Sequence, residues 1–164
     1  MALTFSNNTY RAKTYGSNSF NVPITGYTNL DLVLDDATRA VYLAQPNAQL
    51  RAAQVVAAIN TTVYLRVYDG LGVKRAEGRF LNPWGVSDAQ GKITVGEVDV
   101  AGITVANGGV PNEYWYVRIE GVGNKFVQGG FGVQGNLVNF LWQDPDFTTG
   151  QSFKVGDIQF TCLP

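Results

Sequence analysis

Runs in which apolar and polar residues alternate constrain the fold of this chain more than any other feature. Every second residue of Val63 to Tyr68 is Val or Leu, and every second residue of Tyr114 to Glu120 is Trp, Val or Ile. Successive side chains of a β-strand point to opposite faces of a sheet. The alternation therefore predicts strands with one face in the core and the other in contact with water.

Turn residues separate these runs at short intervals. The chain has 164 residues, a length typical of one domain, and it contains 19 Gly, 8 Tyr, 9 Phe and 3 Trp but only 15% charged residues. This composition favours strands and turns over helices. We predict a mainly β fold, an antiparallel β-sandwich or jelly-roll-like domain over residues 22–164, with a small barrel as the alternative.

One short helix is expected to pack on this domain. Asn47 can cap it, and its apolar stripe, with helical spacing, consists of Ala52, Val55, Val56 and Ile59. A shorter helical pattern precedes it from Asp36 to Ala44 and should end before Pro46. The apolar positions of this shorter pattern are Ala37, Ala40, Val41 and Ala44.

Residues 1–21 are predicted to form an extended N-terminal arm, because they are polar and contain few aliphatic residues. The residues expected to contact a partner are Tyr10, Arg11, Lys13, Tyr15 and Phe20. The alternative is that this segment adds a strand to the sheet of its own domain.

The sequence predicts no enzymatic activity. It contains no histidine, which removes the usual general base and the commonest zinc ligand, and its one cysteine, Cys162, is expected in the core. Two carboxylate pairs, Asp144 with Asp146 and Glu97 with Asp99, could in principle serve acid–base chemistry. They also fit a turn and the wet face of a strand, so we expect no catalytic residue, metal or cofactor.

Glycine-rich segments are expected to be turns rather than ligand-binding loops. Gly121 to Lys125 lacks the Gly-Lys-Ser/Thr ending of a phosphate-binding loop. The run from Gly129 to Gly135 is predicted to lie between strands. These segments therefore do not predict a nucleotide site.

The formal net charge of −1 and the scattered Lys and Arg residues argue against a nucleic-acid partner. No run of apolar residues is long enough to predict a membrane span. A small-molecule ligand is not expected, but a sugar stays open, because sugars stack on exposed rings. The candidate aromatic surface consists of Tyr64, Tyr68, Trp84, Tyr114, Tyr116 and Trp142. The alternative for these residues is cross-strand aromatic pairing or burial against a neighbouring subunit.

Several short elements follow one another from about Arg51 to the C-terminus. They are the Ala-rich segment Arg51 to Ile59, Tyr64 to Gly70, Tyr114 to Ile119, Val127 to Val133 and Thr149 to Gly156. In this order they resemble a family of small virion structural proteins of tailed bacteriophages. The first 50 residues and Pro83-Trp84-Gly85 depart from the family pattern.

The resemblance implies a non-enzymatic, head-associated virion component with no transferable active site. We therefore expect a capsid decoration subunit that binds the head lattice, forms homo-oligomers or contacts the major capsid protein, and is made in the host cytoplasm without secretion. The alternative is a carbohydrate-binding or host-recognition β-sandwich module associated with a tail or fibre.

Overall fold

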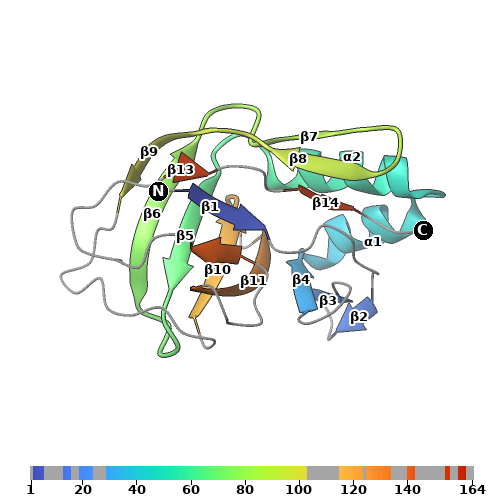
Figure 1. Ribbon diagram of the computed structural model, residues 1–164. Coiled ribbons are helices and arrows are strands. Elements are labelled where there is room, and N and C mark those ends of the chain that lie inside the picture. Colours follow the sequence, from blue (N-terminus) through green and yellow to red (C-terminus); the bar gives the residue numbers. More distant parts are fainter. Residues whose placement is uncertain are drawn as a thin grey trace.

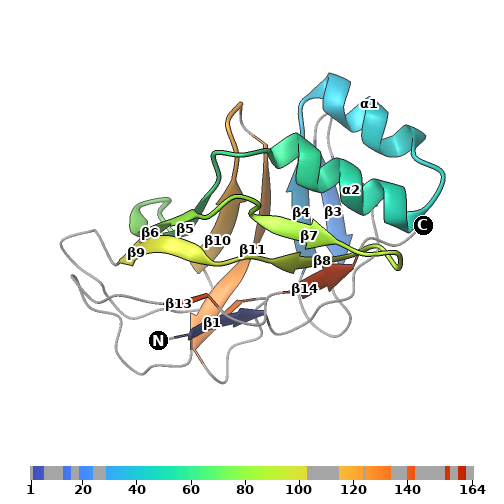
Figure 2. The ribbon, with the colours of Figure 1, turned by 90° about the horizontal axis from the view of Figure 1, so that it is seen from above.

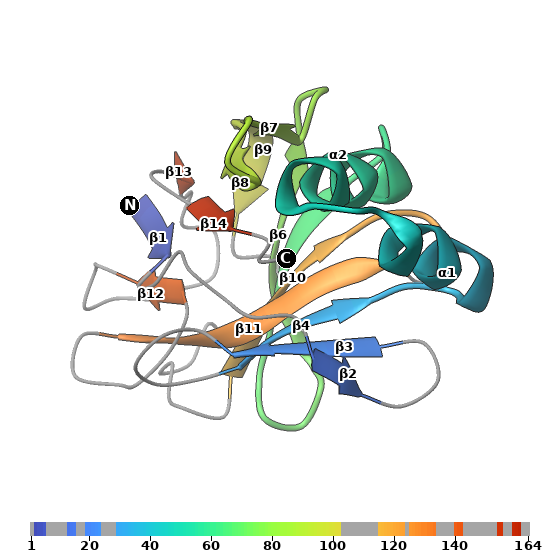
Figure 3. The same cartoon turned by 90° about the vertical axis from the view of Figure 1, so that its right-hand side faces the viewer.

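The structure is a computed structural model and describes residues 2–5, 13–15, 19–23, 29–102, 115–123, 125–133, 140–142, 154–155 and 159–161. Over these residues the chain is mainly β, as the sequence predicts, and carries two helices, α1 (Asp36–Ala44) and α2 (Ala48–Ile59). Both helices lie on the same side of strands β4, β10 and β11 (Figures 1 and 3).

Eleven strands form the larger sheet. They are β1 (Ala2–Phe5), β2 (Lys13–Tyr15), β3 (Ser19–Pro23), β4 (Asn29–Val33), β5 (Tyr64–Tyr68), β6 (Lys74–Phe80), β9 (Val98–Gly102), β10 (Trp115–Glu120), β11 (Phe126–Val133), β12 (Phe140–Trp142) and β13 (Lys154–Val155). Hydrogen-bonded neighbours follow the order β13, β1, β12, β11, β10, β5, β6, β9, and β4, β3 and β2 branch from β11. Most pairs are antiparallel, but β1 with β13 and β11 with β12 are parallel.

Strand β11 produces the branch. Its residues 126–128 pair with β4, whereas its residues 131–133 pair with β12 on the same edge. Gly129 and Gly130 lie between these two segments and pair with β10 on the other edge. The glycine run from Gly129 to Gly135 was predicted to lie between strands. This prediction is wrong for Gly129 to Val133, which belong to β11. Glycine has no side chain to obstruct the change of partner strand at this position.

The described N-terminal strands are part of the larger sheet. Strand β1 pairs with β12 and β13, and β2 pairs with β3, which in turn pairs with β4. These pairings correspond to the alternative in which the segment adds strands to its own domain. The ends of the strand order, β9 and β13, lie near each other, so the sheet curls toward closure (Figures 1 and 2).

A smaller sheet contains β7 (Gly85–Ser87), β8 (Lys92–Val95) and β14 (Gln159–Thr161) in the order β14, β8, β7. Gly96 lies where the chain passes from β8 in this sheet to β9 in the larger one. The backbone packs tightly there, because a Cβ on Gly96 would lie 2.8 Å from the carbonyl oxygen of Pro83.

The core lies between the larger sheet, the smaller sheet and α2. As predicted, the alternating residues of β5 and β10 are buried, together with Val63. Trp84 is 1% exposed, and its Nε1 donates a hydrogen bond to the carbonyl oxygen of Val56 in α2, at 3.1 Å. Its inclusion in an exposed aromatic surface is therefore wrong. The indole is packed against α2 instead of being exposed to water.

The prediction of one helix is also wrong, since both helical patterns form. Asp35 and Asn47 cap α1 and α2 by accepting hydrogen bonds from the Thr38 and Leu50 amides. The predicted stripe of α2 packs inward, with Val56 half-buried and the rest buried. In α1 the predicted apolar positions are exposed and Tyr42 is buried instead. The helix therefore packs through the ring of Tyr42, a large apolar surface contributed by a single residue.

Candidate functional site

The polar face of the larger sheet is the most highly organised surface among the described residues. It is the side of β6, β5, β10 and β11 opposite the core, and we call it the outer face. The outer face comprises Lys74, Glu77, Arg79, Tyr64, Arg66, Tyr68, Tyr116, Arg118, Glu120, Phe126 and Gln128. Strand alternation brings these side chains to one surface.

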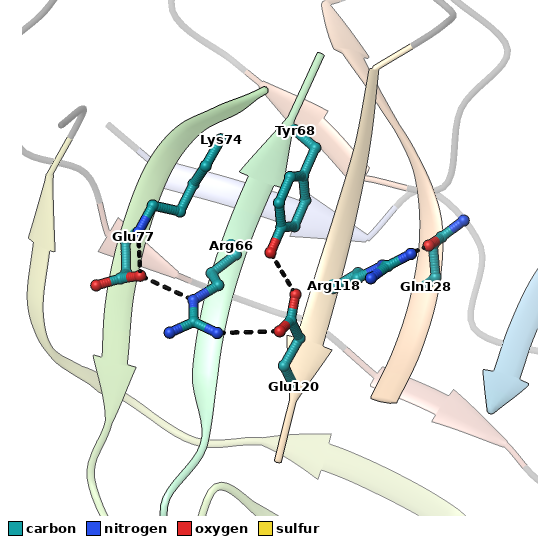
Figure 4. Close-up of polar contacts among 7 residues, drawn as sticks. All are labelled: Arg66, Tyr68, Lys74, Glu77, Arg118, Glu120 and Gln128. Atoms are coloured by element: carbon teal, nitrogen blue, oxygen red, sulfur yellow. Dashed lines mark hydrogen bonds and ion pairs between the residues drawn. The ribbon is translucent and has the colours of Figure 1, made fainter. Parts of the chain in front are cut away.

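Ion pairs cross three strands of the outer face (Figure 4). Arg66 of β5 lies between two carboxylates, with Nε 2.8 Å from Glu77 of β6 and Nη1 3.0 Å from Glu120 of β10. Lys74 adds a second cation to Glu77, at 2.8 Å. Half-exposed pairs contribute about 0.2–1 kcal/mol each. The network therefore fixes the cross-strand arrangement of the side chains more than it stabilises the fold.

Hydrogen bonding in this network shifts the pKa of Glu77. Burial alone would raise the pKa of this carboxyl group, but hydrogen bonds from Lys74 and Arg66 outweigh burial and lower it below its usual 4.5. Glu77 therefore carries its charge throughout the neutral range. Burial would likewise lower the pKa of Arg66, but Glu77 and Glu120 raise it.

Two tyrosines stack at one end of the outer face. Tyr68 and Tyr116 are directly paired across β5 and β10, and their ring centroids lie 5.1 Å apart with the planes 15° from parallel. The Tyr68 hydroxyl donates a hydrogen bond to Glu120 at 2.5 Å. This is the cross-strand aromatic pairing that the sequence offered as the alternative to a sugar-binding surface. Each ring gives one face to its neighbour.

The Tyr68–Glu120 hydrogen bond should be visible by titration. Burial is the main cause that raises the pKa of Tyr68 to about 12, and the hydrogen bond to the charged Glu120 is the second. A Glu120→Gln variant should lower this pKa toward 10, because the charge that opposes phenolate formation is lost. NMR titration of the tyrosine Cζ resonance measures the change. A Glu97→Gln control, which alters an exposed carboxylate outside the network, should leave the Tyr68 resonance unchanged, and an equal shift in both variants would refute the assignment.

Arg118 occupies the middle of the outer face. Its Nε donates a hydrogen bond to Oε1 of Gln128 at 2.7 Å (Figure 4). Its guanidinium carbon lies 4.1 Å from the ring centroid of Phe126 and about equally far, at 5.4 and 5.5 Å, from those of Tyr116 and Tyr68. Ring stacking and one hydrogen bond together fix the orientation of the guanidinium plane.

A row of polar residues crosses seven strands of the sheet at the level of Arg118. The pairing register places these residues opposite one another in the order Glu77, Arg66, Arg118, Gln128, Asp31, Asn21 and Lys13. The backbone pairing of this row therefore continues from β11 across β4 and β3 to β2.

Two hairpin loops share one hydrogen-bond pattern. Oδ1 of Asp69 accepts hydrogen bonds from the amides of Leu71 and Val73. In the same way, Oδ1 of Asp88 accepts hydrogen bonds from the amides of Gln90 and Lys92. The fourth residue of each loop is a glycine with φ of +82°, a conformation that favours glycine. Asp69 is 5% exposed and pairs with Arg75 at 2.7 Å. The β5–β6 loop is therefore held rigidly at the end of the outer face.

The predicted aromatic surface is only partly assembled. Tyr64, Tyr68 and Tyr116 lie on the outer face, Trp84 is buried, and Tyr114 lies outside the described residues. Trp142 lies in β12, opposite Leu3. Arg66 lies over the Tyr64 ring, 4.4 Å from its centroid. The three outer-face tyrosines therefore contact one another or arginines instead of presenting an open platform.

The predicted partner contacts are divided between described and undescribed residues. Lys13 and Tyr15 lie in β2 and Phe20 lies in β3, whereas Tyr10 and Arg11 lie outside the described residues. Their role in binding stays a prediction.

One of the two candidate acid–base pairs lies in the described part of the chain. Asp144 and Asp146 fall outside it, as does Cys162, and Glu97 and Asp99 are exposed near the start of β9. The described ranges contain no group of three or more His, Cys, Asp or Glu side chains that could hold a metal ion. No helix in the same ranges is long and apolar enough to cross a bilayer.

Sequence reasoning did not single out the charged residues of the outer face. Arg66, Arg118 and Glu120 appeared only as the wet positions of two strands, and the strand order was needed to bring them together. The alternation of charge with Tyr in β5 and β10 was the available signal.

Comparison with known proteins found no matching family model, no matching curated protein and no matching solved structure.

Proposed function

We propose that the protein is a non-enzymatic structural subunit of a bacteriophage virion, a decoration subunit that binds the lattice of the capsid head. The resemblance of its ordered elements to small phage virion proteins supports this proposal. The partners are the major capsid protein and further copies of the same chain. The site of action is the virion, after synthesis in the host cytoplasm.

The observation that carries the proposal is the outer face. It is a broad sheet surface whose ion pairs and ring contacts hold side chains in one arrangement before any partner binds. Such preorganisation lowers the entropy lost on association, so it suits a subunit that binds by surface contact. Repetition over a symmetric lattice then multiplies a modest affinity per contact. The proposal includes a sandwich-like or jelly-roll-like relationship between the two sheets.

A carbohydrate-binding or host-recognition module is the alternative function. A sugar needs an accessible ring face, but Tyr68 and Tyr116 stack on each other and Arg66 covers Tyr64. These contacts favour the virion subunit over the sugar-binding module.

Mass spectrometry of purified phage particles tests the proposal. A decoration subunit should be present in several hundred copies per particle, whereas about a dozen copies would indicate a connector. Absence from particles, together with reproducible binding of a defined sugar on a glycan array, would replace the proposal by its alternative.

A further inference from the structure

Arg118 is oriented in advance but has unused donors. Its Nε is bonded to Gln128 and its plane is held by Phe126. Within the ranges that the structure describes, its two terminal nitrogens donate no hydrogen bond, and no carboxylate pairs with it. A guanidinium fixed in this way presents an edge with two parallel N–H donors. That edge matches the two oxygens of a carboxylate.

The outer face is also more positive than the protein as a whole. Its described side chains include four cations, Arg66, Lys74, Arg79 and Arg118, but only two carboxylates, Glu77 and Glu120. The result is a local formal excess of two positive charges in a chain with a net charge of −1.

Arg79 supplies the second cation of the excess. It is exposed on β6, opposite Tyr64 of β5, and forms no ion pair with a described residue. Strand β5 separates β6 from β10, and the pairing register places Arg79 level with Glu120, two residues along β10 from Arg118. Two strand spacings and this two-residue offset put Arg79 and Arg118 about 12 Å apart at the backbone. Two such cations can each receive one carboxylate of an extended acidic chain.

We infer that the outer face binds an acidic protein segment, with Arg118 as the anchor for one carboxylate and Arg79 as the receptor for a second. Arg66 and Lys74 take no direct part, since Glu77 and Glu120 already neutralise them. Their ion pairs instead keep the two protein carboxylates away from the incoming segment. The segment therefore meets two arginines that form no ion pair with a described carboxylate of the protein.

The contacts of the outer face favour a protein segment over other anions. An acidic polysaccharide would gain from ring stacking, but Tyr68 and Tyr116 already stack on each other. An excess of two charges is too small to hold a nucleic-acid backbone at physiological salt. An acidic peptide needs only two carboxylates, one for each arginine, to bind this surface.

This inference deepens the proposed function, and rests on it only for the identity of the partner, since in a virion the acidic segment would belong to the lattice protein. The binding itself can be tested on the isolated full chain. The probes are a fluorescent decaglutamate peptide, a Gly-Ser peptide of the same length, and an oligogalacturonate of matched charge.

The decaglutamate peptide should bind, and added salt should weaken its binding. Arg118→Gln and Arg79→Gln should each weaken it about tenfold, because each removes one charge-assisted contact. The affinity of Arg118→Lys for the peptide should lie between those of wild type and Arg118→Gln. Lysine keeps the positive charge but lacks the two parallel N–H donors of the guanidinium. Lys92→Gln is the matched control, because Lys92 is a half-exposed cation on β8 of the smaller sheet, and it should bind like wild type. Melting curves of all variants identify any loss caused by unfolding.

Three results would overturn the inference. They are no binding at millimolar peptide, equal losses in Lys92→Gln and the arginine variants, or tighter binding of oligogalacturonate than of decaglutamate. Particle analysis separates these failures from failure of the proposed function. If the protein is abundant in particles but does not bind the peptide, only the inference fails. If it binds the peptide through both arginines but is absent from particles, only the virion role fails.

Discussion

A Trp84→Ala variant should lose about 3–5 kcal/mol of unfolding free energy, the range for removing a large buried aromatic side chain. The indole fills the space between β7 and α2 and donates a hydrogen bond to Val56. Alanine would leave a cavity, and the Val56 carbonyl oxygen would keep only its other hydrogen bond, from the Asn60 amide. For a chain of this length, the loss corresponds to a fall in Tm of about 6–20 °C. Urea unfolding and calorimetry measure it.

Val86→Ala is the control for this variant. Val86 lies two residues further along, in β7, but is 60% exposed. Its truncation should change the unfolding free energy by less than about 0.5 kcal/mol. Similar losses in the two variants would show that the indole is not part of the core.

The second large effect is expected at Asp69. An Asp69→Ala variant removes a partly buried ion pair to Arg75 and two hydrogen bonds that organise the β5–β6 loop. Breaking a fully buried pair costs about 3–5 kcal/mol, and because the Arg75 side chain is 20% exposed, we expect a loss at the lower end of this range. Asp88→Ala is a matched control, because Asp88 makes the same loop contacts but its side chain is 39% exposed and 4.0 Å from Lys92. For Asp88→Ala we expect the free energy of unfolding to fall by about 1 kcal/mol.

The contribution of Asp69 should also depend on pH. Burial alone would raise the pKa of Asp69, but the amides of Val73 and Leu71 and the Arg75 guanidinium lower it below 3.8. The unfolded state therefore takes up a proton at higher pH than the folded state does. The contribution of Asp69 to the free energy of unfolding should be complete near neutral pH. It should disappear as the pH falls through the pKa that Asp69 has in the folded state. The difference between wild type and Asp69→Ala should shrink below about pH 3.8, and a constant difference would contradict the assignment.

Local pattern was sufficient where one element determines its own environment. The alternation of Val63 to Tyr68 and of Tyr114 to Glu120 predicted the buried residues of two central strands. Capping by Asn47 and the apolar spacing that follows it predicted α2. In each case, the periodicity of the residues and the periodicity of the backbone agree.

Local pattern was insufficient where strands far apart in the chain meet. Arg118 lies opposite Arg66 on one side and Gln128 on the other, and this juxtaposition depends on strand order. Trp84 was misplaced for the same reason, since α2, which covers it, is not adjacent to it in sequence. In α1, four small apolar residues predicted the helix but not its buried side, because the packing of Tyr42 decided the orientation.

The pairing of β1 with β13 has a consequence for synthesis on the ribosome. About 150 residues separate the two strands, so at 5–20 residues per second β1 waits about 8–30 s for this neighbour. Its other neighbour, β12, also emerges late. Such nonlocal pairings slow folding and leave strand edges open meanwhile. We therefore expect nascent chains that end before β12 to recruit chaperones, whereas the β5–β6 hairpin can close as soon as it emerges.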